Sequence, residues 1–336
     1  MSSLLQQTSQ LLVQSYQSDN IAFKSTKQFP EKKSFLELEL IQKILFPDFF
    51  TRRDKRTFNN VLERLSLLVY HIQNSIEAYY NQQLAEKCIT ALLSQFVTIR
   101  ELVKQDIIAA YAGDPAASSL AMIIRSYPGI HVMMIQRVAH ILYMNGDIEY
   151  SRELMENIHS VTGIDIHPGT SIGNHFFIDH GVGVVIGETA VIGNWCRVYQ
   201  SVTLGAMSFK EDNGIVIKGN KRHPTIGDFV VIGAGAKVLG NITIGSNVKI
   251  GANCWITQNI DQDQIVFISE HPSQITKSST KQSSKDDKII LQSLTENKIS
   301  EEQENLSWVN SPELLCTYTS EESTPINLDC FVSCQQ

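Results

Sequence analysis

The sequence is poor in cysteine, with six residues in 336 and no C-x-x-C pair. A disulfide framework or a zinc ribbon needs more regularly spaced cysteines, so neither is indicated, and a reducing, cytoplasmic location is expected. Long apolar runs are also lacking, since none approaches the roughly eighteen residues of a membrane-spanning helix. Residues 1–16 have no basic leader followed by an apolar segment. We therefore expect neither secretion nor a membrane partner.

The sequence has fewer basic than acidic residues. Lys and Arg number 28 against 35 Asp and Glu, which gives a formal net charge of −7. Nucleic-acid binding favours a concentrated basic face, so no nucleic-acid partner is expected. Apolar residues make up 43% and charged residues 19% of the chain, which is enough apolar material for a buried core.

Residues 278–336 contain no glycine and no arginine, and four Lys stand against ten acidic residues. This segment predicts an acidic, largely disordered tail with at most a short helix near 289–294. Cys316, Cys330 and Cys334 lie in it and are expected to be exposed and unpaired.

The first 160 residues predict a helical domain. Apolar residues recur at three- and four-residue steps between Leu62 and Ile76, which indicates one face of a helix turned to a core. A second helix is predicted over 130–144, preceded by a Pro-Gly breaker and followed by Gly146 as a C-cap.

From about residue 164 an aliphatic residue recurs every six positions. The series is Ile166, Ile172, Ile178, Ile186, Ile192, Val198 and Leu204, then Ile226, Ile232, Val238, Ile244, Ile250 and Ile256. Two extra residues stand between Ile178 and Ile186, and residues 206–221 obey no repeat. Glycine often follows the aliphatic, and a small or apolar residue, such as Val182, occupies the fourth position along, where we expect it to point inward.

Such a unit forms one short strand and a bend, and three units close a triangular coil, so residues 161–277 predict a parallel β-helix. Hexapeptide repeats of this kind wind left-handed. An accidental spacing in a β-sandwich is the alternative, and six successive aliphatics from 226 to 256 disfavour it. The predicted fold is α + β, with a helical domain at 1–160, the left-handed β-helix at 161–277 and the tail at 278–336.

Ionisable residues gather where the repeat is interrupted. His180 precedes the two-residue insertion, and Arg222 and His223 close the long loop. Loops mounted on a rigid solenoid commonly carry sites.

Several of these segments together resemble the serine O-acetyltransferase family. They are DIHP at 165–168, IDHGVGVVIGETA at 178–190, QSVTLG at 200–205, RHP at 222–224 and IGAGAK at 232–237, with DPA at 114–116 and QRVAH at 136–140 in the helical half. The resemblance runs from about residue 36 to 277. It implies acetyl transfer from acetyl-CoA to L-serine, giving O-acetyl-L-serine and CoA, the step that feeds cysteine synthesis, with no metal.

The reaction must remove a proton from a serine hydroxyl as it attacks a thioester. A histidine suits this task because imidazole titrates near neutrality, and His180 is the predicted general base. The resemblance implies that Asp165 is the carboxylate that fixes the tautomer of that imidazole.

The substrate carries an ammonium and a carboxylate. The resemblance implies that Asp114 and Asp179 line the serine site, that Arg222 pairs with the carboxylate and that His223 assists. Four further positions match those where the family's coils approach CoA: Gly205, Ala234, Lys249 and Ala252.

Each residue also has a plainer interpretation. His180, Asp165 and Asp179 could be turn residues, Asp114 could initiate a turn before Pro115, and Arg222 could be a solvated loop cation. His175 and His180 have the H-x4-H spacing of zinc-binding γ-class carbonic anhydrases, but the third ligand position falls in the predicted helical segment, at Ala139 or Met144.

The resemblance also implies a homotrimer or a dimer of trimers, and L-cysteine as a feedback inhibitor. The chain ends in Cys-Gln-Gln and lacks the C-terminal isoleucine with which many members bind O-acetylserine sulfhydrylase, so that complex is not expected. Ala206 replaces a frequent glycine, and the loop at 206–221 is longer than usual, so CoA contacts there can differ. The alternatives are a hexapeptide acyltransferase with another acceptor, and a non-catalytic trimeric scaffold whose tail recruits a partner.

Overall fold

The computed structural model describes residues 8–9, 12–13, 35–51, 57–208, 211–212 and 215–269. The predicted acidic tail, its short helix, its three cysteines and the boundary at 277 lie outside these residues. Residues 1–269 form one compact unit, in which helices and β-helix are joined. Among the described residues, no helix combines the length and the apolar character needed to cross a bilayer.

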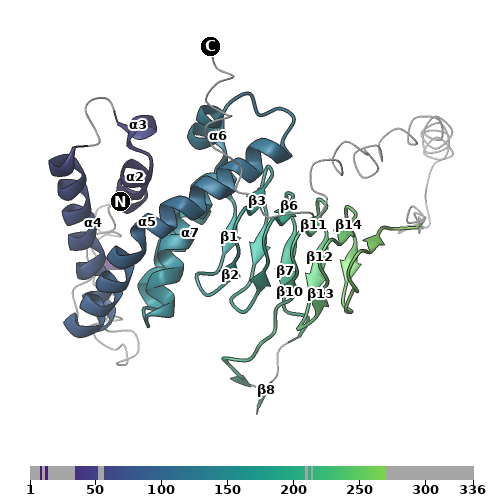
Figure 1. Cartoon of the computed structure of the whole chain (residues 1–336). Coiled ribbons are helices and arrows are strands. Elements are labelled where there is room, and N and C mark those ends of the chain that lie inside the picture. The colour runs from purple at the N-terminus through teal and green to yellow at the C-terminus, as the bar shows by residue number, and fades with distance from the viewer. Residues whose placement is uncertain are drawn as a thin grey trace. The chain divides into compact units, whose positions relative to one another are not determined.

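The N-terminal half is helical, as expected (Figure 1). Its helices are α2 (Leu36–Leu45), α3 (Pro47–Phe50), α4 (Phe58–Tyr79), α5 (Gln82–Gly113), α6 (Leu120–Ser126), α7 (Pro128–Met144) and α8 (Glu149–Thr162). Local sequence sets several helix starts. The side chains of Asn81 and Ser119 accept hydrogen bonds from the first turns of α5 and α6, at 2.9 and 3.2 Å, and Pro128 opens α7.

The apolar stripe of α4 is buried only in part. Ile72 and Ile76 are fully buried, whereas Leu62 is 50% exposed. The first buried residue of this helix is Leu68, so its N-terminal part does not pack against the core. The prediction that Leu62 faces a core is therefore wrong. In α7 the predicted side is buried, including Ile135, Val138 and Leu142.

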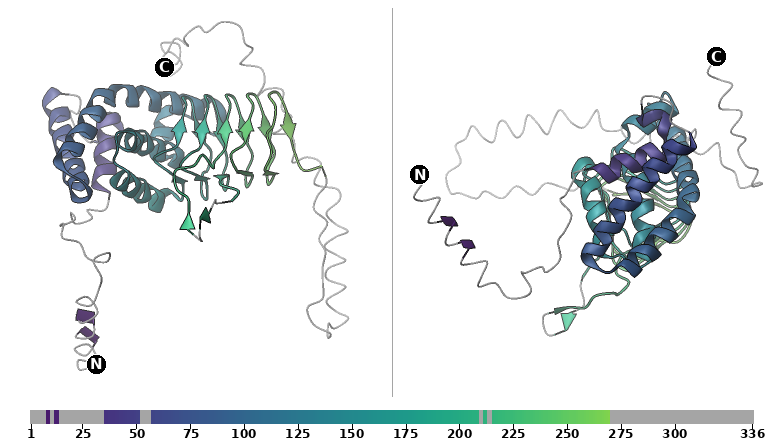
Figure 2. Two further views of the ribbon diagram at one scale, coloured as in Figure 1. Left: turned by 90° about the horizontal axis from the view of Figure 1, so that it is seen from below. Right: turned by 90° about the vertical axis from the view of Figure 1, so that its left-hand side faces the viewer.

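The C-terminal half is a parallel β-helix of short strands in three sheets (Figures 1 and 2). Sheet A contains β1 (Asp165–Ile166), β4 (Val185–Ile186), β7 (Thr203–Gly205), β12 (Lys237–Leu239) and β15 (Trp255–Ile256). Sheet B contains β2 (Ser171–Ile172), β5 (Val191–Ile192), β10 (Thr225–Ile226) and β13 (Thr243–Ile244). Sheet C contains β3 (Phe177–Ile178), β6 (Arg197–Val198), β11 (Val231–Ile232), β14 (Lys249–Ile250) and β16 (Ile265–Val266). A small antiparallel pair, β8 (Glu211–Asp212) and β9 (Ile215–Val216), lies in the long loop.

The register confirms the repeat. Ile186 lies over Leu204, 18 positions later, and Val238 lies over Ile256 at the same spacing. The offset is 20 across the two-residue insertion and 34 across the long loop, as the pairs Ile166–Ile186 and Leu204–Val238 show. The aliphatics stack as buried ladders inside the coil. The fold is the predicted left-handed β-helix.

Val182 departs from the expected pattern. It is 65% exposed, and Val184 fills the interior position instead. The two extra residues delay the return to the core by two positions, so the prediction of an inward Val182 is wrong. In the same turn, His180, Gly181 and Gly183 lie in the left-handed region, with φ of 57°, 87° and 77°.

Two corners of the coil are needed for the description of the site. The C–A corner is formed by the turns that lead from sheet C to sheet A, at 179–184, 199–202, 233–236 and 251–254. The A–B corner is formed by the turns that lead from sheet A to sheet B, at 167–170, 187–190, 206–224 and 240–242.

Candidate active site

His180 stands out from the C–A corner directly after β3. Its side chain is 71% exposed, and its Nδ1 lies 3.7 Å from Oδ1 of Asp179, whose side chain is 15% exposed. Its φ of 57° is shared in sign by residues at other turns of the same corner, such as Ser201 and Asn253, so a left-handed residue is a regular part of these turns. The imidazole is therefore held outward by a rigid turn, within reach of a ligand.

Asp114 reaches the same region from the end of α5. Its Oδ1 accepts a 2.8 Å hydrogen bond from the Ala116 backbone, and its Oδ2 accepts one from the Tyr127 hydroxyl. Asp114 thus forms the turn that the plainer interpretation proposed. Its charge also acts on Asp179: burial raises the pKa of the Asp179 carboxyl and the charge of Asp114 adds to that effect, while His180 and Arg197 oppose it.

Burial and the bond to Asp114 raise the pKa of Tyr127 to about 12, so this phenol stays a hydrogen-bond donor at neutral pH. The C–A corner therefore combines two neighbouring carboxylates, a phenol and an imidazole. Such a group can bind an ammonium and accept a proton nearby.

Asp165 begins sheet A, immediately after α8. Its Oδ1 accepts a 3.0 Å hydrogen bond from Nη1 of Arg152. Although both residues belong to the described part of the chain, neither a hydrogen bond nor an ion pair joins Asp165 to His180. Within one chain the structure does not bring these two predicted residues together, and their pairing stays a prediction.

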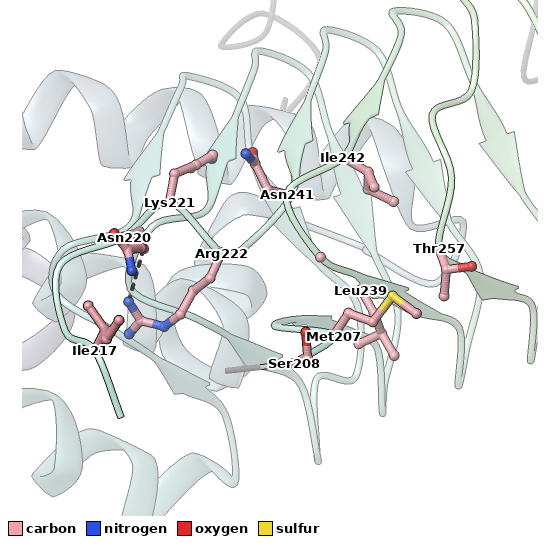
Figure 3. Close-up of a pocket in the computed structure, with 11 residues that line it drawn as sticks. Met207, Ser208, Ile217, Asn220, Lys221, Arg222, Leu239, Asn241, Ile242 and Thr257 are labelled. Atoms are coloured by element: carbon pink, nitrogen blue, oxygen red, sulfur yellow. Dashed lines mark hydrogen bonds between the residues drawn. The ribbon is translucent and has the colours of Figure 1, made fainter. Parts of the chain in front are cut away.

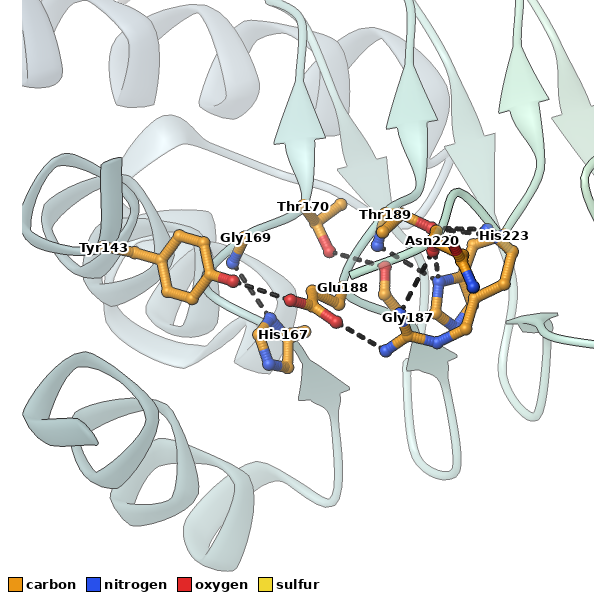
Figure 4. A network of polar contacts seen from close by, with 10 residues as sticks. Tyr143, His167, Gly169, Thr170, Gly187, Glu188, Thr189, Asn220 and His223 are labelled. Atoms are coloured by element: carbon orange, nitrogen blue, oxygen red, sulfur yellow. Dashed lines mark hydrogen bonds and ion pairs between the residues drawn. The ribbon is translucent and has the colours of Figure 1, made fainter. Parts of the chain in front are cut away.

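Arg222 lies at the A–B corner, where it pairs with Glu188, and Figure 4 shows the polar network around Glu188. Its Nη2 bonds Oε2 of Glu188 at 2.5 Å, and the Tyr143 hydroxyl donates to Oε1 of Glu188 at 2.7 Å. Burial raises the pKa of Glu188, but the bonds from Tyr143 and Arg222 outweigh it and lower that pKa overall. Arg222 is therefore an anchored cation with a fixed direction rather than a freely solvated one.

His223 is buried beside Arg222, with 6% of its surface exposed. Its Nδ1 accepts a 3.1 Å hydrogen bond from the Thr189 backbone N–H, which leaves Nε2 to carry the proton of the neutral ring. Burial, assisted by the charge of Arg222, lowers the pKa of His223 to about 4. The ring is thus neutral at pH 7, and it supports the turn that holds Arg222.

The four positions expected near CoA lie in three places: the C–A corner, sheet C and the A–B corner. Ala234 and Ala252 lie on successive turns of the C–A corner, Lys249 lies on sheet C with its side chain half-buried, and Gly205 ends β7 at the A–B corner.

A pocket of about 430 Å³ lies beside Gly205, where the long loop returns to the coil (Figure 3). Its lining includes apolar Met207, Leu239 and Ile242 and the basic Lys221 and Arg222.

The predicted residues thus form two groups. His180, Asp179, Asp114, Ala234 and Ala252 are at the C–A corner, and Arg222, His223 and Gly205 are at the A–B corner. One chain does not bring the two groups together. No sequence pattern indicated a role for Tyr127, Tyr143, Arg152 or Glu188, although Glu188 lies inside the segment at 178–190.

The two histidines of the zinc interpretation lie apart. His175 is at the turn between sheets B and C, where its ring stacks on Trp195 with 3.8 Å between centroids. His180 is at the C–A corner. In the described residues, the one cluster of potential metal ligands is Glu156, His159 and Asp165, and the guanidinium of Arg152 already lies against both carboxylates.

Comparison with known proteins agrees with this geometry. Residues 223–258 match the family model described as bacterial transferase hexapeptide (six repeats). A serine acetyltransferase encoded on a plasmid of Synechococcus elongatus is 42% identical over 262 residues, which are 72% of this chain and 82% of that protein.

Two solved structures are similar over most of the chain. Serine acetyltransferase isoform 3 of Entamoeba histolytica, in complex with cysteine, is 88% identical, with 93% of this chain and 100% of that chain covered and a TM-score of 0.68. Serine acetyltransferase 1 of the same organism, in complex with L-cysteine, is 55% identical over 76% of this chain and 94% of that chain, with a TM-score of 0.68. The hexapeptide β-helix, the exposed His180 and these relatives agree, and the chain belongs to the serine acetyltransferase family of acyltransferases.

Proposed function

We propose that the protein transfers the acetyl group of acetyl-CoA to the hydroxyl of L-serine, with His180 as the general base. The imidazole takes the proton of the serine hydroxyl while the oxygen attacks the thioester carbonyl. Collapse of the tetrahedral intermediate breaks the carbon–sulfur bond, and the proton passes from the imidazole to the departing thiolate. The observation that carries the proposal is the outward imidazole beside two carboxylates in a chain of this family.

Serine binding divides between the two charged groups. Asp114 and Asp179 receive the ammonium, and Arg222 receives the carboxylate in a two-point contact. His223 assists indirectly: its neutral ring accepts a hydrogen bond from the Thr189 backbone, and the Thr189 hydroxyl accepts one from the Arg222 backbone. L-Cysteine has the same ammonium and carboxylate, so we propose that it inhibits by occupying the serine site.

Because the two groups lie at different corners, we propose that the active unit is a homotrimer. Each site then forms where the C–A corner of one copy faces the A–B corner of the next. Asp165 lies on sheet A, between these corners, where we propose that it fixes the tautomer of a His180 ring.

Acetyl-CoA is proposed to lie along the small residues Gly205, Ala234 and Ala252. The apolar and basic lining of the pocket beside Gly205 suits a pantetheine arm and phosphates, with Lys249 as a further cation. The cytoplasmic location predicted from cysteine usage is part of this proposal.

The test is the initial rate of thiol release from acetyl-CoA by the purified full chain. We expect release with L-serine and suppression by millimolar L-cysteine. Homoserine, which has one extra methylene, should react about 10- to 200-fold more slowly, and an amino sugar, which leaves the carboxylate-binding group unpaired, at least about 100-fold more slowly. Equal or faster release with another acceptor supports the alternative acyltransferase, and release with none supports the scaffold alternative.

A further inference from the structure

Arg152 is the one side chain that holds the Asp165 carboxylate in the described part of the chain. Its Nη1 donates to Oδ1 of Asp165 at 3.0 Å, and Oδ2 of Asp165 has no hydrogen-bond partner there. One carboxylate oxygen is therefore fixed and the other is open. The two side chains are 33% and 26% exposed, so the pair is partly shielded from water.

Arg152 is itself held from a second side. Its Nη2 forms an ion pair with Glu156, one turn later on α8, and the other oxygen of Glu156 contacts Nδ1 of His159 at 3.1 Å. The guanidinium is planar and is held by Glu156 through Nη2, so the direction from which Nη1 donates to Asp165 is fixed.

The chain path makes this geometry rigid. The helix α8 ends at Thr162, and its C-cap Gly163, with a left-handed φ of 69°, turns the chain toward β1. Thus Arg152 and Asp165 lie on two elements separated by only two residues, and the backbone N–H of Asp165 bonds the Val184 carbonyl at 2.9 Å. Both ends of the Arg152–Asp165 contact are anchored.

We infer that Arg152 is a positioning residue for acetyl transfer, which orients the Asp165 carboxylate so that its open oxygen meets a His180 imidazole in the site between neighbouring copies. This inference rests on the proposed function, in which Asp165 fixes that imidazole. Arg152 touches neither substrate. It acts only through Asp165, so removing it should lower turnover without weakening substrate binding.

The test compares R152Q, R152K, D165N and the double variant R152Q/D165N of the full chain, with K104Q as a control that removes an exposed cation from α5. We expect R152Q to lower kcat on the order of 10-fold, as losses of supporting partners commonly do, with both KM values within about twofold. R152K, which keeps one charge but cannot bridge two carboxylates, should fall between R152Q and wild type. K104Q should match wild type.

The double variant separates positioning from general damage. If Arg152 acts through Asp165, R152Q should have no further effect in the D165N background. Equal activity of R152Q and wild type overturns the inference, and so does an equal loss from R152Q with and without Asp165.

Failure of the proposed function gives a different pattern, since wild type then releases no thiol with serine, or D165N turns over like wild type. A crystal structure of R152Q tests the inference without turnover. A rotated Asp165 carboxylate supports it, and an unchanged carboxylate overturns it.

Discussion

His180 combines a left-handed backbone with the proposed role of general base. It lies in the turn between β3 and β4, and its side chain is mostly exposed, so few contacts that stabilise the fold depend on the ring. The ring can therefore be removed with little effect on stability, which makes its chemical role testable.

We expect H180N to lose about 10²- to 10⁴-fold in kcat, the usual contribution of a general base. Asparagine tolerates the left-handed region, so the turn should persist. Thiol release measures the loss, and the thermal unfolding midpoint should stay near that of wild type. Full activity of the H180N enzyme would contradict the role of His180 as general base.

His175 lies at the preceding turn of the coil, where its packed ring contributes to stability. Burial, assisted by the charge of Arg137, lowers its pKa from 6.5 to about 4. The unfolded chain therefore binds the proton more readily than the folded protein does, and the stability linked to His175 is lost as pH falls from about 6.5 to 4.

H175F keeps a ring to stack on Trp195 but cannot titrate. From pH 7 to 5, wild type should lose about 1 kcal/mol more unfolding free energy than H175F, after allowance for partial solvent screening. Urea unfolding at the two pH values measures this. Because the proteins differ at one position, titration of other groups cancels, and equal losses contradict the low pKa of His175.

Residue types at the site were predictable from sequence, but their contacts were not. The position of His180 before an insertion was visible, whereas the Arg152 contact of Asp165 and the Tyr143 contact of Glu188 join segments 13 and 45 residues apart. Such pairs depend on how α7 and α8 pack against the first coil, and no local pattern encodes that packing.

At the scale of elements, α7 closes the first coil of the β-helix. An uncovered coil end leaves backbone carbonyls without partners. Side chains of α7 supply donors: Gln136 to the Thr170 carbonyl, Arg137 to the Ile172 and Gly173 carbonyls, and His140 to the Pro168 carbonyl, at 2.7 to 3.2 Å. Arg137 also forms a two-point ion pair with Asp106 of α5, at 2.9 and 3.0 Å.

We expect R137M to lower the unfolding free energy by about 3–5 kcal/mol, because it leaves the fully buried Asp106 unpaired. K104M, which breaks an exposed pair on the same helix as Asp106, should cost less than about 1 kcal/mol. Denaturant unfolding compares the two. Similar small losses in both would contradict a role for the buried pair in joining helices to coil.

The elements themselves were unequally predictable. A strict six-residue aliphatic spacing has few structural solutions, so the three sheets and the 18-residue register followed from it. The inward position at 182 was predicted wrongly because a count cannot tell where two extra residues are absorbed. Helix α4 was predicted as an amphipathic helix, but how far along it the core extends depends on its neighbours.

At the scale of the whole molecule, the account depends on an assembly. One chain presents the proposed base and the proposed ammonium-binding carboxylates at the C–A corner and the anchored Arg222 at the A–B corner. Serine is too small to contact groups on two separate corners of a single coil, so we propose that neighbouring copies supply them together.

The most direct test of this central claim mixes two inactive variants, H180N and R222A, by co-expression with different tags and purification of the mixed oligomers. Each variant alone should be nearly inactive. Every mixed cyclic trimer contains one interface that pairs an intact His180 with an intact Arg222, so about a third of the sites in the purified mixed oligomers should be active. Mixed oligomers that show no more thiol release than the separate variants would contradict the account.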